Sequence, residues 1–234
     1  MKKLAKVSAL IVAGFMLFAF TNMGGGNNFE GVVTFTFNID GDAPPQAAQM
    51  MQGSTIKTYI KGNMSRTESN FGMMKTVTIA DKSKPDGTVM LMDMMGNKYQ
   101  LKMDDKTKKE ADDAKPAEIK YLDGTKTIAG YACKEAQATM IDKKSGTTYT
   151  SDIYYTEDLP YNNETPSAQF KGLKGFPMSF NMKKSGISFT IAAQSIVKQS
   201  VPDSMFAVPA GYKLMTQDDM QKDMMSHMGG GGGN

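Results

Sequence analysis

Soft sulfur ligands are the residues of this sequence with the clearest potential for chemistry. The chain holds 22 methionines, and several of them gather near the C-terminus beside the single histidine. Cu(I) accepts thioether ligands, so this group is a candidate metal site. Its members are Met220, Met224, Met225, His227 and Met228. Met220 and Met224 also fall on the apolar side of a possible amphipathic helix, where they would serve packing alone.

Residues that could form a catalytic site are scarce. The one histidine lies in the C-terminal tail, which rules out a Ser-His-Asp or Cys-His pair within the preceding domain. No nucleophile elbow, phosphate loop or HExxH zinc motif occurs. A carboxylate pair for glycoside hydrolysis stays open, because such pairs meet only in the fold, but the chain has no Trp to stack on a sugar. We therefore predict a protein that is not an enzyme and has no cofactor.

Alternating aromatic and methionine side chains supply the candidate binding residues. Methionine is flexible and polarisable, so a concave surface lined by it can adapt to different apolar ligands. The candidates are Phe35, Phe37, Met90, Met92, Met178, Phe180, Met182 and Phe189. A filled hydrophobic core has the same alternation, and for any single residue we favour that interpretation.

Cys133 is the only cysteine, so it cannot form a disulfide within the chain. It is either unpaired or bonded to another chain. Free cysteines are among the most buried residue types. We therefore expect Cys133 to pack as a small apolar side chain.

Period-two alternation of β-branched and aromatic residues dominates the chain and predicts about ten strands. Residues 33–39 alternate clearly, and we expect 55–64 and 75–80 to be antiparallel neighbours. Gly-containing turns predict three hairpins. These hairpins join 88–93 to 98–102, 136–141 to 147–156, and 176–182 to 187–191. The sequence thus predicts a mainly β protein whose curved antiparallel sheet forms a half-barrel or open barrel.

The remaining segments connect or flank these strands. Residues 104–118 are rich in mixed charges and predict a solvated linker, after which strands resume at Thr125. Short helices are expected at 45–52 and 216–227, the second with Thr216 and Asp219 in a weak capping box. Gly130 and Gly211 each precede a tyrosine at an expected turn or close approach, and Val208-Pro209 is expected to end a strand.

The N-terminus has the pattern of a secretory signal peptide. A basic start is followed by a mostly apolar run at residues 7–20, which is shorter than the roughly 20 residues of a membrane-spanning helix. We place the signal peptide at 1–23, the β domain at 24–215, and a short amphipathic helix with a Gly-rich tail at 216–234. With no cysteine near the cleavage region, we expect no lipid anchor.

The charge of the mature chain argues against a nucleic-acid partner. Three of the 27 basic residues lie within residues 1–23, so the remaining basic residues balance the 24 acidic ones. A neutral chain has no general attraction for phosphate backbones or anionic lipids. We expect a periplasmic or secreted protein that does not span the membrane once processed.

Three short motifs carry a resemblance to a known family. They are TIAGYAC at 127–133, IYYT at 153–156 and FAVPAGYK at 206–213. In this order and spacing they resemble a domain-of-unknown-function family of exported Gram-negative bacterial proteins, with the Ile-x-Gly-Tyr-x-Cys and Phe-x-Val-Pro-x-Gly-Tyr patterns. That family is similar in predicted fold to the LolA-like periplasmic lipoprotein carriers. The resemblance implies an unclosed antiparallel barrel whose concave face receives acyl chains, and it assigns no site residues.

These observations favour an exported binding protein that holds an apolar ligand, such as a lipid acyl chain, in a concave sheet. Two alternatives stay open: a methionine-rich copper-binding accessory protein, and a structural envelope protein with a filled core and a protein partner on its exterior.

Overall fold

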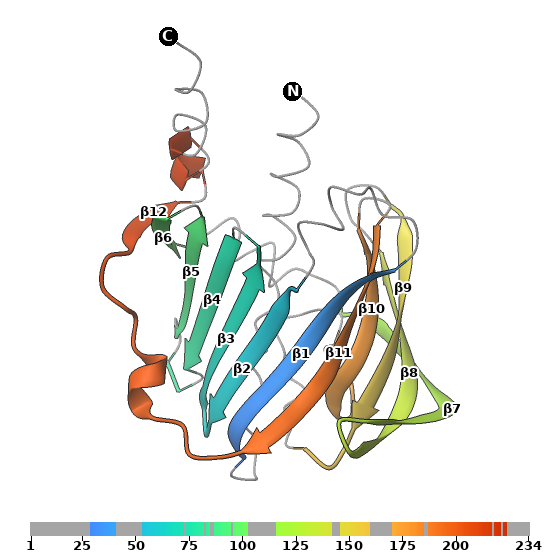
Figure 1. Ribbon diagram of the computed structural model, residues 1–234. Coiled ribbons are helices and arrows are strands. Elements are labelled where there is room, and N and C mark those ends of the chain that lie inside the picture. The colour runs from blue at the N-terminus through green and yellow to red at the C-terminus, as the bar shows by residue number, and fades with distance from the viewer. Residues whose placement is uncertain are drawn as a thin grey trace.

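The computed structural model describes residues 29–40, 53–72, 74–81, 83–84, 87–94, 96–102, 116–141, 146–159, 170–184, 187–216, 218–220 and 222–223. Twelve strands within these residues form one curved sheet (Figure 1). The strands are β1 (Glu30–Asp40), β2 (Thr55–Lys61), β3 (Met64–Phe71), β4 (Met74–Asp81), β5 (Thr88–Met94), β6 (Asn97–Lys102), β7 (Glu118–Ile128), β8 (Tyr131–Ile141), β9 (Thr148–Thr156), β10 (Phe176–Lys184), β11 (Ile187–Lys198) and β12 (Lys213–Thr216). A 3-10 helix, η1 (Asp203–Phe206), lies between β11 and β12. No helix among the described residues is long and apolar enough to cross a membrane.

The sheet consists of two meanders joined at its centre. The strand order is β12-β6-β5-β4-β3-β2-β1-β11-β10-β9-β8-β7. The first strand of the first meander, β1, pairs with the last strand of the second, β11. All neighbouring pairs are antiparallel except β12 and β6, which are parallel. This arrangement confirms the predicted curved antiparallel sheet.

Tight turns at glycines explain how consecutive strands pair. Gly96 has a φ of 86° in the turn between β5 and β6, and Gly130 has a φ of 84° in the turn between β7 and β8. Residues with a side chain rarely adopt this backbone conformation, and two-residue hairpin turns require it. All three predicted hairpins are present, although the second one uses a longer β8 than expected.

Each strand directs alternate side chains to two faces of the sheet. On β1, Val33 and Phe35 are fully buried, whereas Thr34 and Thr36 on the opposite face are only partly buried. We call the face of Val33 and Phe35 the inner face, because both residues belong to the main hydrophobic core. The opposite face is the outer face.

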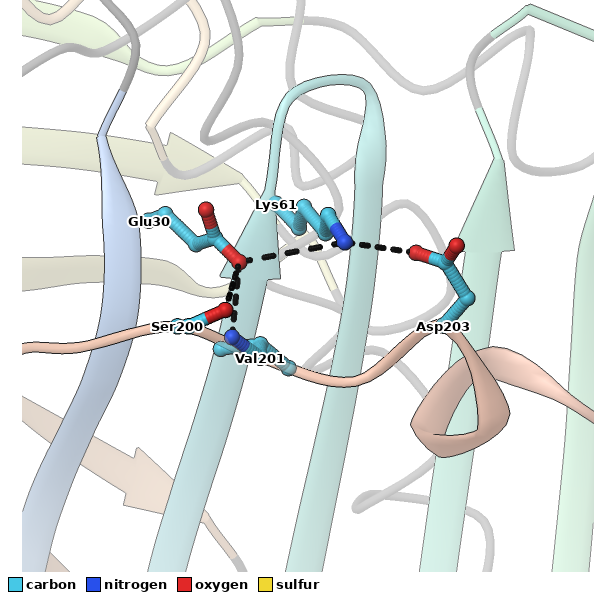
Figure 2. A network of polar contacts seen from close by, with 5 residues as sticks. All are labelled: Glu30, Lys61, Ser200, Val201 and Asp203. Carbon is cyan, nitrogen blue, oxygen red and sulfur yellow. Dashed lines mark hydrogen bonds and ion pairs between the residues drawn. The ribbon is translucent and has the colours of Figure 1, made fainter.

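Residues 199–212, here called the strap, cross the outer face between β11 and β12 (Figure 1). The Glu30 carboxylate accepts hydrogen bonds from the Val201 amide at 2.7 Å and the Ser200 hydroxyl at 3.3 Å. Lys61 lies between Glu30 at 3.9 Å and Asp203 at 2.6 Å (Figure 2). These contacts fix the start of the strap to β1 and β2.

Two apolar side chains of the outer face are also buried. Ile79 and Leu91 face outward yet are 5% and 2% exposed, and neither belongs to the main core. Arg66, the β3 partner of Ile79, donates from Nη1 to the Met205 carbonyl in the strap at 3.1 Å. The strap therefore covers apolar outer-face side chains that the sheet alone would leave in water.

Several sequence-based expectations differ from the structure. The segments 55–64 and 75–80 are not neighbours, because β3 lies between β2 and β4. β3 has no apolar alternation, since its inward residues are mostly Ser and Thr. Strands resume at Glu118 rather than Thr125, and a bulge between Tyr121 and Thr125 interrupts the pattern of β7. Val208-Pro209 ends no strand and belongs to the irregular strap.

Other predictions fall outside the described residues. They concern the signal peptide at 1–23, the helix at 45–52, most of the linker at 104–118, and the tail beyond 223.

Candidate ligand-binding face

An apolar row crosses the inner face from β1 to β7. Strand register aligns its members side by side, one from each of six neighbouring strands. They are Phe37, Ile191, Phe180, Ile153, Ala136 and Tyr121. All belong to the main core or pack against it. Such a row is a continuous surface that favours apolar contacts over a distance of several strands.

The β7–β11 end of this row is covered by groups of the protein itself. The ring of Phe170 meets that of Phe180 edge to face, with centroids 4.8 Å apart. The Tyr121 hydroxyl donates to the Gly172 carbonyl and accepts from the Lys174 amide, both at 3.1 Å. The segment 170–174 is thereby fixed to the edge strand. In addition, β7 contacts β11 although three strands lie between them in the sheet. This half of the sheet is tightly curled.

The structure brings the predicted binding residues together on the inner side of the sheet. Phe35, Phe37, Met92, Met178 and Phe180 are buried in one core cluster, and the partly buried Met90 and Phe189 pack against it. Met182 lies in β10 opposite Phe189 in β11, and its side chain is outside the described part of the structure. These residues come from both meanders, which meet at Phe37 and Phe189 with ring centroids 5.1 Å apart.

The inner face of β2–β4 has a different chemistry that the sequence analysis missed. Here hydroxyl side chains occupy inward positions, and we call them the hydroxyl surface. Its members are Thr58, Ser65, Thr67, Ser69, Thr76 and Thr78. The first four are at most 7% exposed. The signal that could have found them is the Ser-x-Thr-x-Ser alternation of residues 65–69.

Charged side chains are absent from the inward positions of β1–β6 in the described ranges. The same strands carry Lys57, Arg66, Glu68 and Lys75 on the outer face. Arg66 and Glu68 form an ion pair there at 2.6 Å. The two faces are therefore separated by charge, and the inner face is apolar or neutral polar.

The C-terminal segment closes the inner face at the β6 edge. Met220 is fully buried in the main core. The Thr216 hydroxyl accepts from the Asp219 amide at 3.2 Å, which confirms the predicted cap. The Tyr99 hydroxyl donates to Asp223 at 2.8 Å, and burial together with this carboxylate raises the pKa of Tyr99 to about 12.

These contacts bear on the candidate copper site. Met220 is packed among apolar side chains, where its thioether contributes hydrophobic contacts. Met224, Met225, His227 and Met228 lie outside the described residues. Within the described part of the chain, no group of three or more His, Cys, Asp or Glu side chains is arranged to hold a metal ion.

Cys133 on β8 is 1% exposed and free, as expected for a buried apolar side chain. Burial raises the pKa of its thiol, which keeps the thiol protonated at neutral pH. Its Sγ lies 3.4 Å from the Tyr131 carbonyl. The cysteine of the 127–133 motif is thus a packing residue beside the Ala129-Gly130 turn.

Comparisons with known proteins place this sheet in a family. A family model described as "Domain of unknown function (DUF4412)" matches residues 29–212. No curated protein sequence matches the chain significantly.

Two solved structures are similar in outline. The Mycobacterium tuberculosis lipoprotein LppX has a TM-score of 0.39 and 8% identity, with 74% of this chain and 89% of that chain covered. LprF from Mycobacterium bovis has a TM-score of 0.37 and 10% identity, with 78% and 90% covered.

Proposed function

The chain belongs to the DUF4412 family, and on that premise we propose that it is an exported, non-enzymatic binding protein that holds a lipid or other apolar ligand against the inner face of its sheet. The observation that carries the proposal is the continuous apolar inner face, to which both meanders contribute and on which Met90 and Phe189 are only partly buried. The apolar leader at residues 7–20 supports export to the periplasm or the medium.

The architecture supports the proposal because the single sheet leaves part of its inner face only partly buried. Protein domains are built from at least two packed layers. All twelve described strands belong to a single sheet, and the strap lies on its outer face. Among the described residues, the inner face of β2–β5 is not matched by a second sheet. A bound apolar ligand would add buried area at the partly buried side chains of this face, such as Met90 and Phe189, at roughly 25 cal/mol per Å² of apolar surface.

Native mass spectrometry of the mature protein, purified from its own cell envelope, tests the proposal. We expect an adduct of lipid mass that disappears after chloroform–methanol extraction. Phe189→Ala should reduce occupancy at least fivefold, because it removes a ring beside Phe37 that is only partly buried. Val197→Ala is the matched control on the same strand, since Val197 is 48% exposed.

The other outcomes overturn the proposal. A protein that carries no extractable adduct, and that takes up none from lipid vesicles, would be a structural envelope protein with a filled core. Uptake of Cu(I) without a lipid adduct, abolished by deletion of residues 224–234, would instead identify the copper alternative. An adduct equally affected by Phe189→Ala and Val197→Ala would place the ligand elsewhere.

A further inference from the structure

The hydroxyl surface is unusual because its side chains are buried at the centre of a sheet, where β3 is paired with a strand on each side. Thr67 and Ser69 occupy inward positions of β3, where the corresponding positions of β1 hold Val33 and Phe35. Burying a hydroxyl group is unfavourable unless it forms hydrogen bonds. A core that only needed volume would be more stable with apolar residues here.

The hydrogen bonds of this surface leave capacity for a further partner. The Thr58 and Thr67 hydroxyls bond each other at 3.1 Å. Each hydroxyl has one donor and two acceptor positions, so the pair retains one donor after this bond forms. Thr58 is fully buried and Thr67 is 3% exposed, which places the remaining donor away from bulk water.

Ser54 provides an independent observation at the end of the same face. Its hydroxyl oxygen is buried and has no hydrogen-bond partner among the described residues. Thr36, Thr55 and Asn70 lie side by side on β1, β2 and β3. Ser54 comes one residue before Thr55, at the level where β1 has Phe37 and β3 has Phe71. The rings of these two residues meet edge to face at 5.5 Å. A buried hydroxyl without a partner costs stability unless a ligand supplies one.

Apolar side chains flank the hydroxyl surface on both sides. One row of paired residues runs across the sheet from β1 to β5 in the order Phe35, Ile56, Ser69, Thr76 and Met92. A ligand bound here would contact hydroxyl groups at its centre and apolar groups around them. The absence of charge from the inward positions of β1–β6 disfavours an ionic group, because a buried unpaired charge is costly.

We infer that the hydroxyl surface and Ser54 bind the uncharged polar groups of an amphiphile, such as ester, hydroxyl or amide groups, whose chain lies against the partly buried apolar side chains of the inner face. This inference rests on the proposed function and specifies its ligand class. Neutral lipids with a hydrogen-bonding head are accepted, and free fatty-acid anions are discriminated against.

Competition binding with three probes of similar chain length tests this specificity: monooleoylglycerol, oleate and 1-octadecene, each displacing a fluorescent apolar dye. We expect the wild-type protein to bind monooleoylglycerol at least tenfold more tightly than oleate. In Thr58→Val/Thr67→Val, affinity for monooleoylglycerol should fall about tenfold, the effect of losing one or two hydrogen bonds. Affinity for 1-octadecene should stay within twofold.

Controls separate binding from folding. The double variant removes both members of a hydrogen-bonded pair and keeps their shape, so the fold should tolerate it. Thr34→Val changes the same side-chain type on the outer face and should leave all three affinities unchanged. Ser54→Ala is a second test that leaves the Thr pair intact, and it should weaken monooleoylglycerol binding about fivefold.

The outcomes distinguish this inference from the proposed function. If wild-type protein binds 1-octadecene and monooleoylglycerol but neither variant changes the ratio, the inference is overturned and the proposed function stands. Tight binding of oleate would overturn it in the same way. If the wild-type protein binds none of the three probes, the proposed function fails, and the inference fails with it.

Discussion

The β1–β6 half and the β7–β11 half of the sheet bury their inner faces by different means. In the second half, aromatic and aliphatic side chains such as Phe180 and Ile153 pack against Phe170 and against a strongly curled edge. In the first half, the central inward positions are hydroxyl groups, and apolar contacts also form on the outer face under the strap. The same strand periodicity therefore supports a mainly apolar interior in one half and an interior with a central group of hydroxyl side chains in the other.

The difference shows that burial and hydrophobicity are separate properties of this fold. Thr58 is as fully buried as Ile153. Stability should therefore respond much more strongly to truncation in the second half, whereas ligand specificity should respond to substitution in the first.

Truncation of the apolar row should have the largest effect. We expect Phe180→Ala to lower the free energy of unfolding by about 3–5 kcal/mol, because it leaves a cavity in a closely packed region. Thr58→Val/Thr67→Val in the other half should change it by less than about 1 kcal/mol. Urea unfolding followed by circular dichroism measures both. Equal effects would contradict the contrast between the two halves.

Truncation beneath the strap should follow in size. Leu91→Ala is expected to lower the free energy of unfolding by about 2–4 kcal/mol, because Leu91 is 2% exposed. Leu214→Ala on β12, where the side chain is 62% exposed, is the control and should cost less than about 0.5 kcal/mol. Similar values for the two variants would mean that the strap does not cover the outer face.

The Tyr99–Asp223 hydrogen bond should contribute a pH-dependent stability of about 1 kcal/mol. The pKa of Tyr99 is raised in the folded state to about 12 from the ordinary value of 10, so the contribution is fully present below pH 10 and is lost as pH rises through 12. The difference in unfolding free energy between wild-type protein and Tyr99→Phe should therefore shrink between pH 8 and pH 11.5. A difference that is constant with pH would contradict the raised pKa.

The ion pairs that hold the start of the strap should have the smallest effect. Lys61 and Asp203 lie at the surface, with side-chain exposures of 33% and 78%, so Lys61→Met should lower the midpoint of urea unfolding only slightly. The difference should vanish in 1 M NaCl, since salt screens exposed charges. A large fall in the unfolding midpoint that salt does not alter would show that Lys61 acts through packing instead.

The sequence predicted those parts of the fold in which local patterns agree with each other. The β5–β6 and β10–β11 hairpins combine clear alternation with a Gly-containing turn, and both were found. β3 was missed because its inward residues are polar, so hydropathy does not distinguish it from a loop. The strap was missed because its contacts, such as that of Val201 with Glu30, connect residues far apart in sequence.

The candidate site was predictable only in part for the same reason. Alternating Phe and Met residues indicated the apolar inner face, since burial of such residues follows from their type. Which of them are neighbours depends on the β1–β11 pairing, which no local pattern reveals. Ser54 and the hydroxyl surface were missed, because Ser and Thr are common at exposed positions as well and the alternation of residues 65–69 does not by itself indicate burial.

The central position of β1 also determines how this sheet can assemble. β1 and β2 are close in sequence and can form a hairpin early, but the Thr36 hydroxyl donates to the carbonyl of Ala192, 156 residues away. Non-local strand pairs form slowly, because their loop-closure entropy must be overcome first. Until β11 has been synthesised, β1 keeps a long edge with unpaired amide and carbonyl groups, which is a template for intermolecular association. The interval between the emergence of β1 and that of β11 is therefore the period in which this chain is most exposed to aggregation.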